Sequence, residues 1–190
     1  MIATLFVGKK VRLSTLDLDQ DAPLISQWSH DIDYQALIDS DPARPLSISQ
    51  VRKKYQKEEA DSHLVNFGLR TSTEFRLVGI AGFRWIDYPN GNAWLLLGIG
   101  DPKDRNQGYG RDAIQLLLRY AFFELNLHRI TAQTFEYNQI AQNLLESSGF
   151  TLEVRQRQAI HRYERRWDSL LYGILRDEWM QMQAQDREST

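Results

Sequence analysis

The residues with the clearest chemical potential lie in one segment, 101–111, which reads Asp-Pro-Lys-Asp-Arg-Asn-Gln-Gly-Tyr-Gly-Arg. It follows an apolar stretch and precedes a helical pattern, so we expect a helix N-terminus there, with unpaired backbone N–H groups and the positive end of the helix dipole. Such a terminus is a natural phosphate site. Gly108 and Gly110 allow a tight turn and the close approach of a ligand, while Arg105 and Arg111 add positive charge. The spacing alone fits a simple strand-to-helix turn equally well.

The elements that must position this loop follow from periodicity. Apolar residues recur at helical spacing from Ile114 to Leu125 and predict an amphipathic helix directly after the loop. Near the N-terminus, Asp21 is predicted to cap a helix that has Pro23 in its first turn. The remaining predicted elements are a loop over 29–46, helices over 49–60 and 140–145, and strands over 11–13, 64–69, 76–86, 92–99, 130–135, 150–158 and 167–175.

This order predicts a mixed α+β fold with one central sheet and helices on its faces. An Asn-Gly pair at 90–91 predicts a hairpin between two of the strands. The length of 190 residues suits one domain, expected over 1–190, with a core over 11–179 and a frayed tail over 180–190.

Several blocks of the sequence resemble the GNAT superfamily of N-acetyltransferases. The segment 97–110 contains Arg-x-x-Gly-x-Gly, the acetyl-CoA signature of that superfamily, and 120–129 continues the likeness. Residues 138–150 resemble its second block, an Asn followed by a helix that ends in Gly-Phe. The stretch 167–179 resembles the branch of ribosomal-protein N-terminal (alanine) acetyltransferases and their small-molecule relatives. The likeness is dense over 94–179 and rests on element order before that.

The resemblance implies a GNAT-like, mostly antiparallel sheet in which strand 92–99 bulges and splays from strand 130–135 to form an acetyl-CoA cleft. The pantetheine arm would pair in that gap with backbone groups of Leu97 and Ile99, as an added strand would. Asn138 is expected to bond the pantetheine and Ala141 to line the thiol end. The backbone amides expected to hold the pyrophosphate are those of Arg105, Asn106, Gln107, Gly108, Tyr109, Gly110 and Arg111.

The chain departs from the family pattern where catalysis would depend on it. Many members carry a tyrosine in the short helix to protonate the departing thiolate, and alignment on Asn138 and Gly149 puts Leu145 at that position. Some relatives use a serine where this chain has Ala141. The motif therefore places no hydroxyl for the proton, and Tyr137 is the candidate nearby.

Acetyl transfer to an amine also requires removal of a proton from the nucleophile. Asp87, Glu136, Glu153 and Asp168 are candidate bases, and Asp168 is preferred because it matches an acidic position of the family. Each of them is also compatible with an ordinary solvated surface carboxylate. No covalent enzyme intermediate is expected.

The expected acceptor is a primary amine on a small molecule or a protein N-terminus: a peptide N-terminus, a polyamine or an aminoglycoside-like compound. Aspartates at 31, 33, 39 and 41 lie where the family builds its acceptor wall and could attract a cationic amine, or could form a polar surface loop. The aromatic candidates for that pocket are Trp28, Tyr34, Trp85 and Trp94. For Trp28 and Trp94 a position in the core is favoured.

Composition excludes several other classes of protein. The net charge of −2 gives no overall attraction to nucleic acid or anionic membrane. The chain has no cysteine, which rules out disulfides, a thiol nucleophile and cysteine-ligated zinc, and its four histidines lack metal-ligand spacing. We therefore expect no metal. No apolar run approaches the roughly 20 residues that span a bilayer, and a cytoplasmic location is expected.

The sequence also allows three alternatives to an acetyltransferase. A non-catalytic acetyl-CoA sensor is compatible with Leu145, whereas a P-loop enzyme lacks its Gly-Lys-Ser/Thr motif. A nucleic-acid interface would use the arginines between 155 and 166, but Glu153 and Glu164 interrupt them, so a solvated hairpin is favoured. A homodimer is left open.

Overall fold

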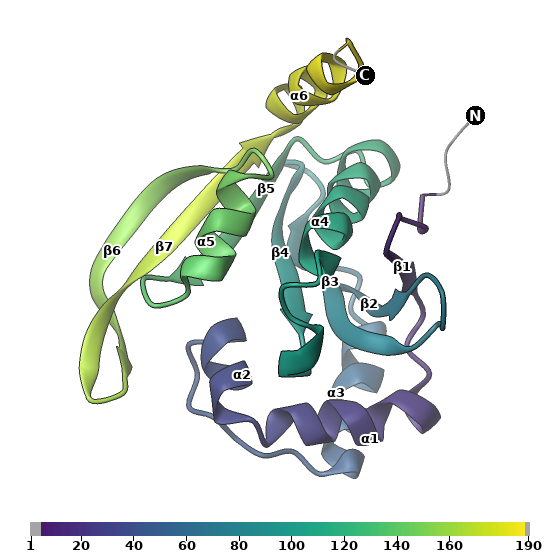
Figure 1. Cartoon of the computed structure of the whole chain (residues 1–190), viewed down its shortest axis with the longest axis vertical. Helices are drawn as coiled ribbons and strands as arrows, with labels where there is room; N and C mark the ends of the chain where they lie inside the picture. Colours follow the sequence, from purple (N-terminus) through teal and green to yellow (C-terminus); the bar gives the residue numbers. More distant parts are fainter. Residues whose placement is uncertain (1–4, 189–190) are drawn as a thin grey trace.

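A seven-stranded sheet organises the chain, and its strands follow the order β1-β2-β3-β4-β5-β7-β6 (Figure 1). The computed structural model describes residues 5–188, with side chains through residue 185. Only the β4–β5 pair is parallel among the strand pairs of the described chain, which confirms a mixed, mostly antiparallel sheet. The strands are β1 Val11–Ser14, β2 Val65–Thr71, β3 Leu77–Asp87, β4 Asn92–Ile99, β5 Arg129–Phe135, β6 Thr151–Arg162 and β7 Arg165–Leu175.

The helices pack on both faces of this sheet, as predicted. One apolar core joins the sheet to the apolar face of α4, and a second, separate core joins it to α1, α2 and α3. No helix in the described part of the chain is long and apolar enough to cross a bilayer. The helices are α1 Leu18–Ser29, α2 Ile32–Ile38, α3 Ile48–Glu59, α4 Tyr109–Arg119, α5 Gln139–Glu146 and α6 Arg176–Glu188, with a 3₁₀ turn at Pro102–Asp104 and a π turn at Tyr120–Glu124.

The N-terminal helix begins earlier than predicted. Its cap is Asp17, whose carboxylate accepts hydrogen bonds from the amides of Asp19 and Gln20, so the assignment of the cap to Asp21 was wrong. Asp21 is buried instead and pairs with Arg70 of β2, with 2.7 Å between Oδ2 and Nη2. A buried carboxylate requires such a partner, and this pair ties α1 to the sheet.

The segment 29–46, predicted as a loop, contains the seven-residue helix α2. Asp31 caps it by accepting hydrogen bonds from the amides of Asp33 and Tyr34, and the side chains of Tyr34 and Ala36 are buried. A helix this short has too few turns to show periodicity. Because α2 carries Tyr34 toward the sheet, this correction matters for the site described below.

Strands β4 and β5 separate after a short region of pairing. Their register covers Asn92–Trp94 on β4 and Arg129–Thr131 on β5 and then stops, whereas β4 stays paired with β3 as far as Ile99. The predicted splay is therefore confirmed. The irregularity in register lies between Arg84 and Asp87 of β3 rather than on β4, so the bulge was predicted on the wrong strand.

The C-terminal part also differs in detail from the prediction. The helix after the glycine loop ends as α4 at Arg119 and continues as a π turn, in which the Leu125 amide donates to the Tyr120 carbonyl. The tail forms α6 as far as Glu188, and residues 189–190 of the predicted frayed tail lie outside the described residues. Figure 1 shows the β6–β7 hairpin and α6 extending away from the body of the sheet.

Candidate active site

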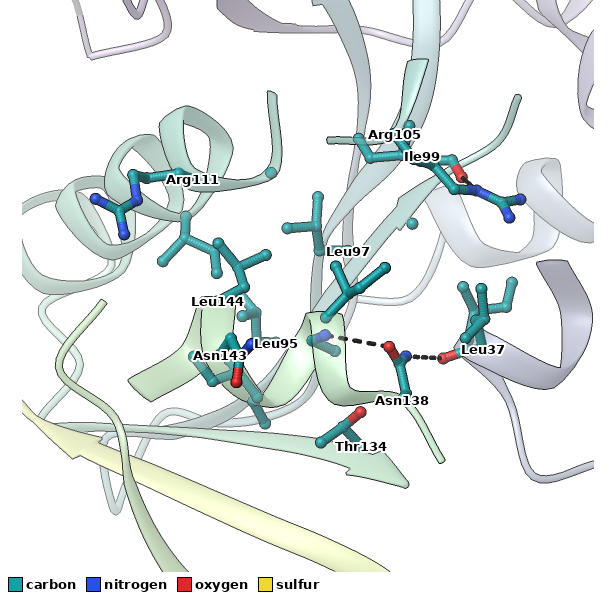
Figure 2. Close-up of a pocket in the computed structure, with 18 of the residues that line it drawn as sticks. Leu37, Leu95, Leu97, Ile99, Arg105, Arg111, Thr134, Asn138, Asn143 and Leu144 are labelled. Atoms are coloured by element: carbon teal, nitrogen blue, oxygen red, sulfur yellow. Dashed lines mark hydrogen bonds between the residues drawn. The ribbon is translucent and has the colours of Figure 1, made fainter. Parts of the chain in front are cut away.

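The splay between β4 and β5 opens into a cleft of about 660 Å³ (Figure 2). Its volume lies within the roughly 300–1,000 Å³ typical of ligand sites. It lies between the N-terminus of α4, the helix α5 and the C-terminal half of β4. The sequence-predicted residues that line it are Leu97, Ile99, Arg105, Asn106, Gly108, Gly110, Arg111, Asn138 and Ala141, whereas Gln107 and Tyr109 do not.

At one end of the cleft, α4 presents an open helix N-terminus. Gly108 is its cap residue and has a left-handed backbone (φ +80°), and no side chain of the described residues caps this end. The first-turn amides of α4 therefore have no partner within the helix. Asn106 also has a positive φ of 61°, a conformation that asparagine tolerates better than most residues. This geometry leaves several N–H groups for an anion.

Two anchors fix this loop to the body of the protein. Arg76 and Asp104 form a bidentate ion pair with both N–O distances at 2.7 Å, and Asp104 is buried. At the start of α4, the Asp112 carboxylate accepts hydrogen bonds from the backbone amides of three residues just before and within β1. The ammonium of Lys10 donates to the Gln107 carbonyl at 2.7 Å. The loop is thus held from both sides before any ligand binds.

The two arginines of the loop do not converge on one point. The Arg105 guanidinium donates to the Gly100 carbonyl at 2.9 Å, approaches Asp31 at 3.4 Å and lies over the Tyr34 ring. Figure 2 shows it on the opposite side of the cleft from Arg111. Arg111 is exposed, and it has no ion pair among the described residues. Both arginines were predicted to lie near the bound phosphate. Arg105 instead holds α2 against the end of β4.

Asn138 lies at the junction of β5 and α5. Its side-chain oxygen accepts from the Ala141 amide at 3.1 Å and caps α5, and its Nδ2 donates to the Leu37 carbonyl at 3.3 Å. Figure 2 shows both bonds. Asn138 therefore caps a helix and ties it to α2, while still lining the cleft.

Replacing Asn138 with alanine should lower the stability of the protein by about 1 kcal/mol, the usual value of a lost helix cap. If Asn138 also bonds the pantetheine, the KM for acetyl-CoA should rise several-fold in addition. Thermal denaturation and steady-state kinetics on the same variant separate the two roles. A lower Tm with an unchanged KM would leave only the structural role.

Two hydroxyl groups were not singled out for the cleft by the sequence. Thr134 of β5 is 2% exposed, lines the cleft, and its Oγ1 has no hydrogen-bond partner among the described residues. Tyr34 of α2 also lines the cleft, and its ring is buried between Trp28 and Arg105. Its hydroxyl lies close to Gly98, where an added Cβ would come within 2.9 Å, and no hydrogen-bond partner for it occurs within residues 5–188.

Burial raises the pKa of the Tyr34 phenol well above its ordinary value, Arg105 opposes that shift, and Asp31 adds to it. The group is therefore a protonated donor over the working range of most enzymes. The sequence predicted Tyr34 in the acceptor pocket but not the helix that carries it, so its place in the larger cleft as well was not predicted.

A second cavity of about 190 Å³ lies beside the first. Trp94 and Phe135 line it but not the larger cleft, and both cavities share Tyr34 and Gly98. Along β5, Ala132 and Thr134 line only the cleft, Phe135 lines only the smaller cavity, and Gln133 lines both. This distribution fits side chains that alternate between the two faces of a strand, with Gln133 near the junction. The two cavities therefore approach from opposite faces and meet where β4 and β5 part.

The predicted catalytic side chains lie outside both cavities. The Asp168 carboxylate accepts from the Gln158 amide at 2.9 Å and from Arg155 at 2.7 Å, and these bonds hold its pKa below the ordinary value. A carboxylate so engaged is a weak base. Tyr137 donates its hydroxyl to the Ala36 carbonyl at 2.5 Å and packs against Phe135 and other aromatic rings. Its role here is to fasten α2 to β5.

Three of the four aspartates predicted for the acceptor wall do not line the smaller cavity and make contacts outside it. Asp31 caps α2, Asp33 accepts from the Tyr163 hydroxyl at 3.1 Å, and Asp41 accepts a bond from Arg162 through its carbonyl. Only Asp39 lines the smaller cavity. Of the four aromatic candidates, Tyr34, Trp85 and Trp94 line that cavity. Trp28 is buried in the core, as favoured, whereas the core position favoured for Trp94 was wrong.

Known proteins resemble this chain in sequence. The family model described as acetyltransferase (GNAT) domain matches residues 10–151. The chain is 26% identical over 177 residues to the uncharacterized N-acetyltransferase p20 of Bacillus licheniformis, an alignment that covers 90% of this chain and 96% of that protein. It is 34% identical over 81 residues to the uncharacterized N-acetyltransferase YnaD of Bacillus subtilis (strain 168), covering 43% of this chain and 48% of YnaD, about half its length.

Solved structures show the same fold. The spermidine N-acetyltransferase from Vibrio cholerae in complex with CoA and spermine has a TM-score of 0.81 at 22% identity, with 90% of this chain and 98% of that chain covered. A GNAT-family acetyltransferase from Bacillus anthracis has a TM-score of 0.76 at 23% identity, with coverage of 90% and 98%. Because the acetyltransferase (GNAT) domain model matches residues 10–151, the chain belongs to the GNAT family and is an N-acetyltransferase of that family.

Proposed function

We propose that this protein transfers an acetyl group from acetyl-CoA directly to a primary amine, with the two substrates entering from opposite faces of the splayed sheet. The observation that carries the proposal is the meeting of two cavities at Tyr34 and Gly98, where β4 and β5 part. The larger cavity ends at the open N-terminus of α4, and the smaller one opens on the other face.

The residues of the larger cleft fit acetyl-CoA. The first-turn amides of α4 and the unpaired side chain of Arg111 suit a pyrophosphate. Beyond Trp94, the edge of β4 that faces β5 has no strand partner in the described part of the chain, so Leu97 and Ile99 can pair with the pantetheine amides as an added strand would. The carbonyl of Ile99 is partly engaged already, by Arg105 at 3.4 Å. Thr134 adds a free hydroxyl on the facing wall.

The reaction follows from this arrangement. Acetyl-CoA, when bound, supplies the acetyl group as a thioester. The neutral amine nitrogen attacks the carbonyl carbon, a C–N bond forms, and the C–S bond breaks. Tyr34 gives its phenolic proton to the leaving sulfur, and the proton that the amine loses restores the phenol. Positioning of the two reactants contributes on the order of 7–11 kcal/mol in favourable cases.

The function is tested by incubating the purified protein with acetyl-CoA and a panel of amines that includes a peptide N-terminus, a polyamine and an aminoglycoside. Release of free CoA thiol and a mass increase of one acetyl group on the amine are the expected results. Reaction with hydroxyl or thiol acceptors alone would contradict an amine acceptor.

The second candidate function is a non-catalytic acetyl-CoA-binding module, which the presence of Leu145 in the cleft wall favours. Tight acetyl-CoA binding by calorimetry, combined with no thiol release for any amine, would support that function over catalysis.

Leu145→Tyr tests how much the motif position still matters. Leu145 is 5% exposed and lines the cleft. A phenol there adds a second acid, but the packing around it is shaped for leucine and opposes the larger ring. We expect kcat to rise by no more than about five-fold in the wild-type background, and by more when Tyr34 is also phenylalanine. If steady-state kinetics gave the same fold-change in kcat in both backgrounds, the phenols of residues 34 and 145 would not act as alternative proton donors.

A further inference from the structure

The charged side chains that line the smaller cavity indicate which kind of acceptor it can bind. This inference rests on the proposed function, in which that cavity holds the acceptor. Arg84 of β3 and Lys54 of α3 both line it, and Asp39 is its one carboxylate within the described chain. Asp39 is exposed, and one of its oxygens accepts the Asp41 amide at 3.0 Å. The cavity therefore has more positive than negative charge, although the chain as a whole is slightly acidic.

Arg84 is the informative residue because it is partly buried and unpaired. Its Nε is buried without a hydrogen-bond partner, and no carboxylate of the described residues lies within ion-pair distance of its guanidinium. A buried N–H donor without a hydrogen-bond partner is costly, so such groups are normally paired. Arginine is also well suited to bidentate binding of a carboxylate or phosphate. An anionic group on the ligand would supply the missing partner.

Lys54 can contribute a second positive charge. Its Nζ lies 4.0 Å from Glu58, at the limit of an ion pair, and its side chain is 43% exposed. Glu58 is itself bonded to the side-chain amide of Asn66 at 2.8 Å through its other oxygen. The Nζ atom also lies over the Tyr55 ring, 5.5 Å from the ring centroid, so the positive charge lies at the wall of the cavity.

The remaining walls are aromatic. Trp85 and Trp94 meet edge to face with 5.2 Å between ring centroids, and Tyr55 and Phe135 complete the lining. Trp85 is 65% exposed and has a positive φ of 50°, an unfavourable conformation for a bulky residue. Strained, exposed aromatics of this kind occur at ligand sites. The walls suit a compact acceptor with an apolar or aromatic part.

We propose that the acceptor is a small primary amine that also carries an anionic group, a carboxylate or a phosphate, held by Arg84 with Lys54. Its amine would lie at the junction with the larger cleft, near Tyr34 and Gly98. A polyamine is a poor fit because its additional positive charges would meet the two cations of the cavity. The volume of about 190 Å³ limits the occupant to roughly amino-acid size.

The test uses pairs of amines that differ only in the anionic group: phenylalanine and phenethylamine, tryptophan and tryptamine, O-phosphoethanolamine and ethanolamine, with spermidine added. We expect at least one anionic member to exceed its partner in kcat/KM by about 10- to 100-fold, the usual worth of a charge-assisted hydrogen bond. The amino acids and the phosphoamine distinguish carboxylate from phosphate.

Arg84→Gln should remove most of this preference, because it should lower kcat/KM for the anionic member of each pair far more than for its uncharged partner. Arg84→Lys should retain part of it. Arg157→Gln is the matched control, because Arg157 is exposed on β6 and lies outside both cavities. Since the side chain of Arg84 makes no hydrogen bond or ion pair within the described chain, its replacement should not lower the Tm. An unchanged Tm therefore separates a ligand role from a structural one.

The outcomes distinguish this inference from the proposed function. If spermidine or the uncharged amines are preferred, or if Arg84→Gln lowers kcat/KM equally for both members of a pair, the anionic acceptor is overturned while the transferase assignment stands. If the protein binds acetyl-CoA in calorimetry and acetylates no amine of the panel or of the wider screen, the proposed function falls, and this inference falls with it.

Discussion

Tyr34→Phe should lower kcat for acetyl transfer by about 10²- to 10⁴-fold, the range over which a general acid usually acts. The KM for acetyl-CoA should change little, because the ring keeps its contacts with Trp28 and Arg105. The hydroxyl has no hydrogen-bond partner among the described residues, so its removal leaves no protein group unsatisfied. A large loss of rate with an unchanged Tm would therefore identify a chemical role.

The dependence on pH follows from the direction of the Tyr34 pKa. Burial raises it above the ordinary tyrosine value of about 10, and an acid acts in its protonated form. The protonated phenol thus persists as the pH rises, and wild-type kcat should show no alkaline decline below about pH 10. The acidic decline, where the amine is protonated, should be common to wild type and Tyr34→Phe.

Tyr120→Phe is the matched control for this experiment. Tyr120 packs against Phe67 and Phe83 and lies outside both cavities, so its hydroxyl has no route to the substrates. An unchanged kcat in Tyr34→Phe would remove Tyr34 from the chemistry. A sharp alkaline decline near neutral pH in the wild type would instead point to an acid with a lower pKa.

The phosphate end of the site could be predicted because its chemistry is local. Gly108 and Gly110 lie at a helix start, and neighbouring residues alone determine where the free amides point. The strands around it were also predictable, and β4 has the bounds 92–99 that its apolar pattern indicated. The anchors of the loop were not, because Arg76 and Asp104 are 28 residues apart and meet only in the folded chain.

The acceptor side depends on contacts between distant segments, and there the sequence was a weaker guide. Tyr137 and Asp168 were chosen for their types and positions, yet each is engaged by other parts of the protein, Tyr137 by the Ala36 carbonyl and Asp168 by Arg155. Conversely, Tyr34 reaches the cleft on a helix too short to be recognised. Arg84 could not be predicted as a site residue, because a single arginine on a strand is common. Only the folded structure shows that its buried Nε has no hydrogen-bond partner.

Gly110→Val should weaken CoA binding by about 100-fold or more. Gly110 lies in the first turn of α4, where an added Cβ would come within 3.0 Å of Leu144 on α5 and 4.0 Å of Leu97 on β4. A valine side chain would therefore project into the cleft between the helix N-terminus and α5. Access of the pyrophosphate to the amides would be blocked, and the loss of two charge-assisted hydrogen bonds accounts for an effect of this order.

The fold should tolerate this change, because Gly110 has an ordinary helical backbone and valine is no worse than glycine inside a helix. Leu144 is flexible at the point of contact and can move aside. Gln107→Val is the matched control: it adds the same side chain to the same loop, but residue 107 is exposed and outside the cleft lining. Calorimetry with CoA should give weak binding for Gly110→Val and near wild-type binding for Gln107→Val. Equal affinities in all three proteins would show that the pyrophosphate does not bind at the N-terminus of α4.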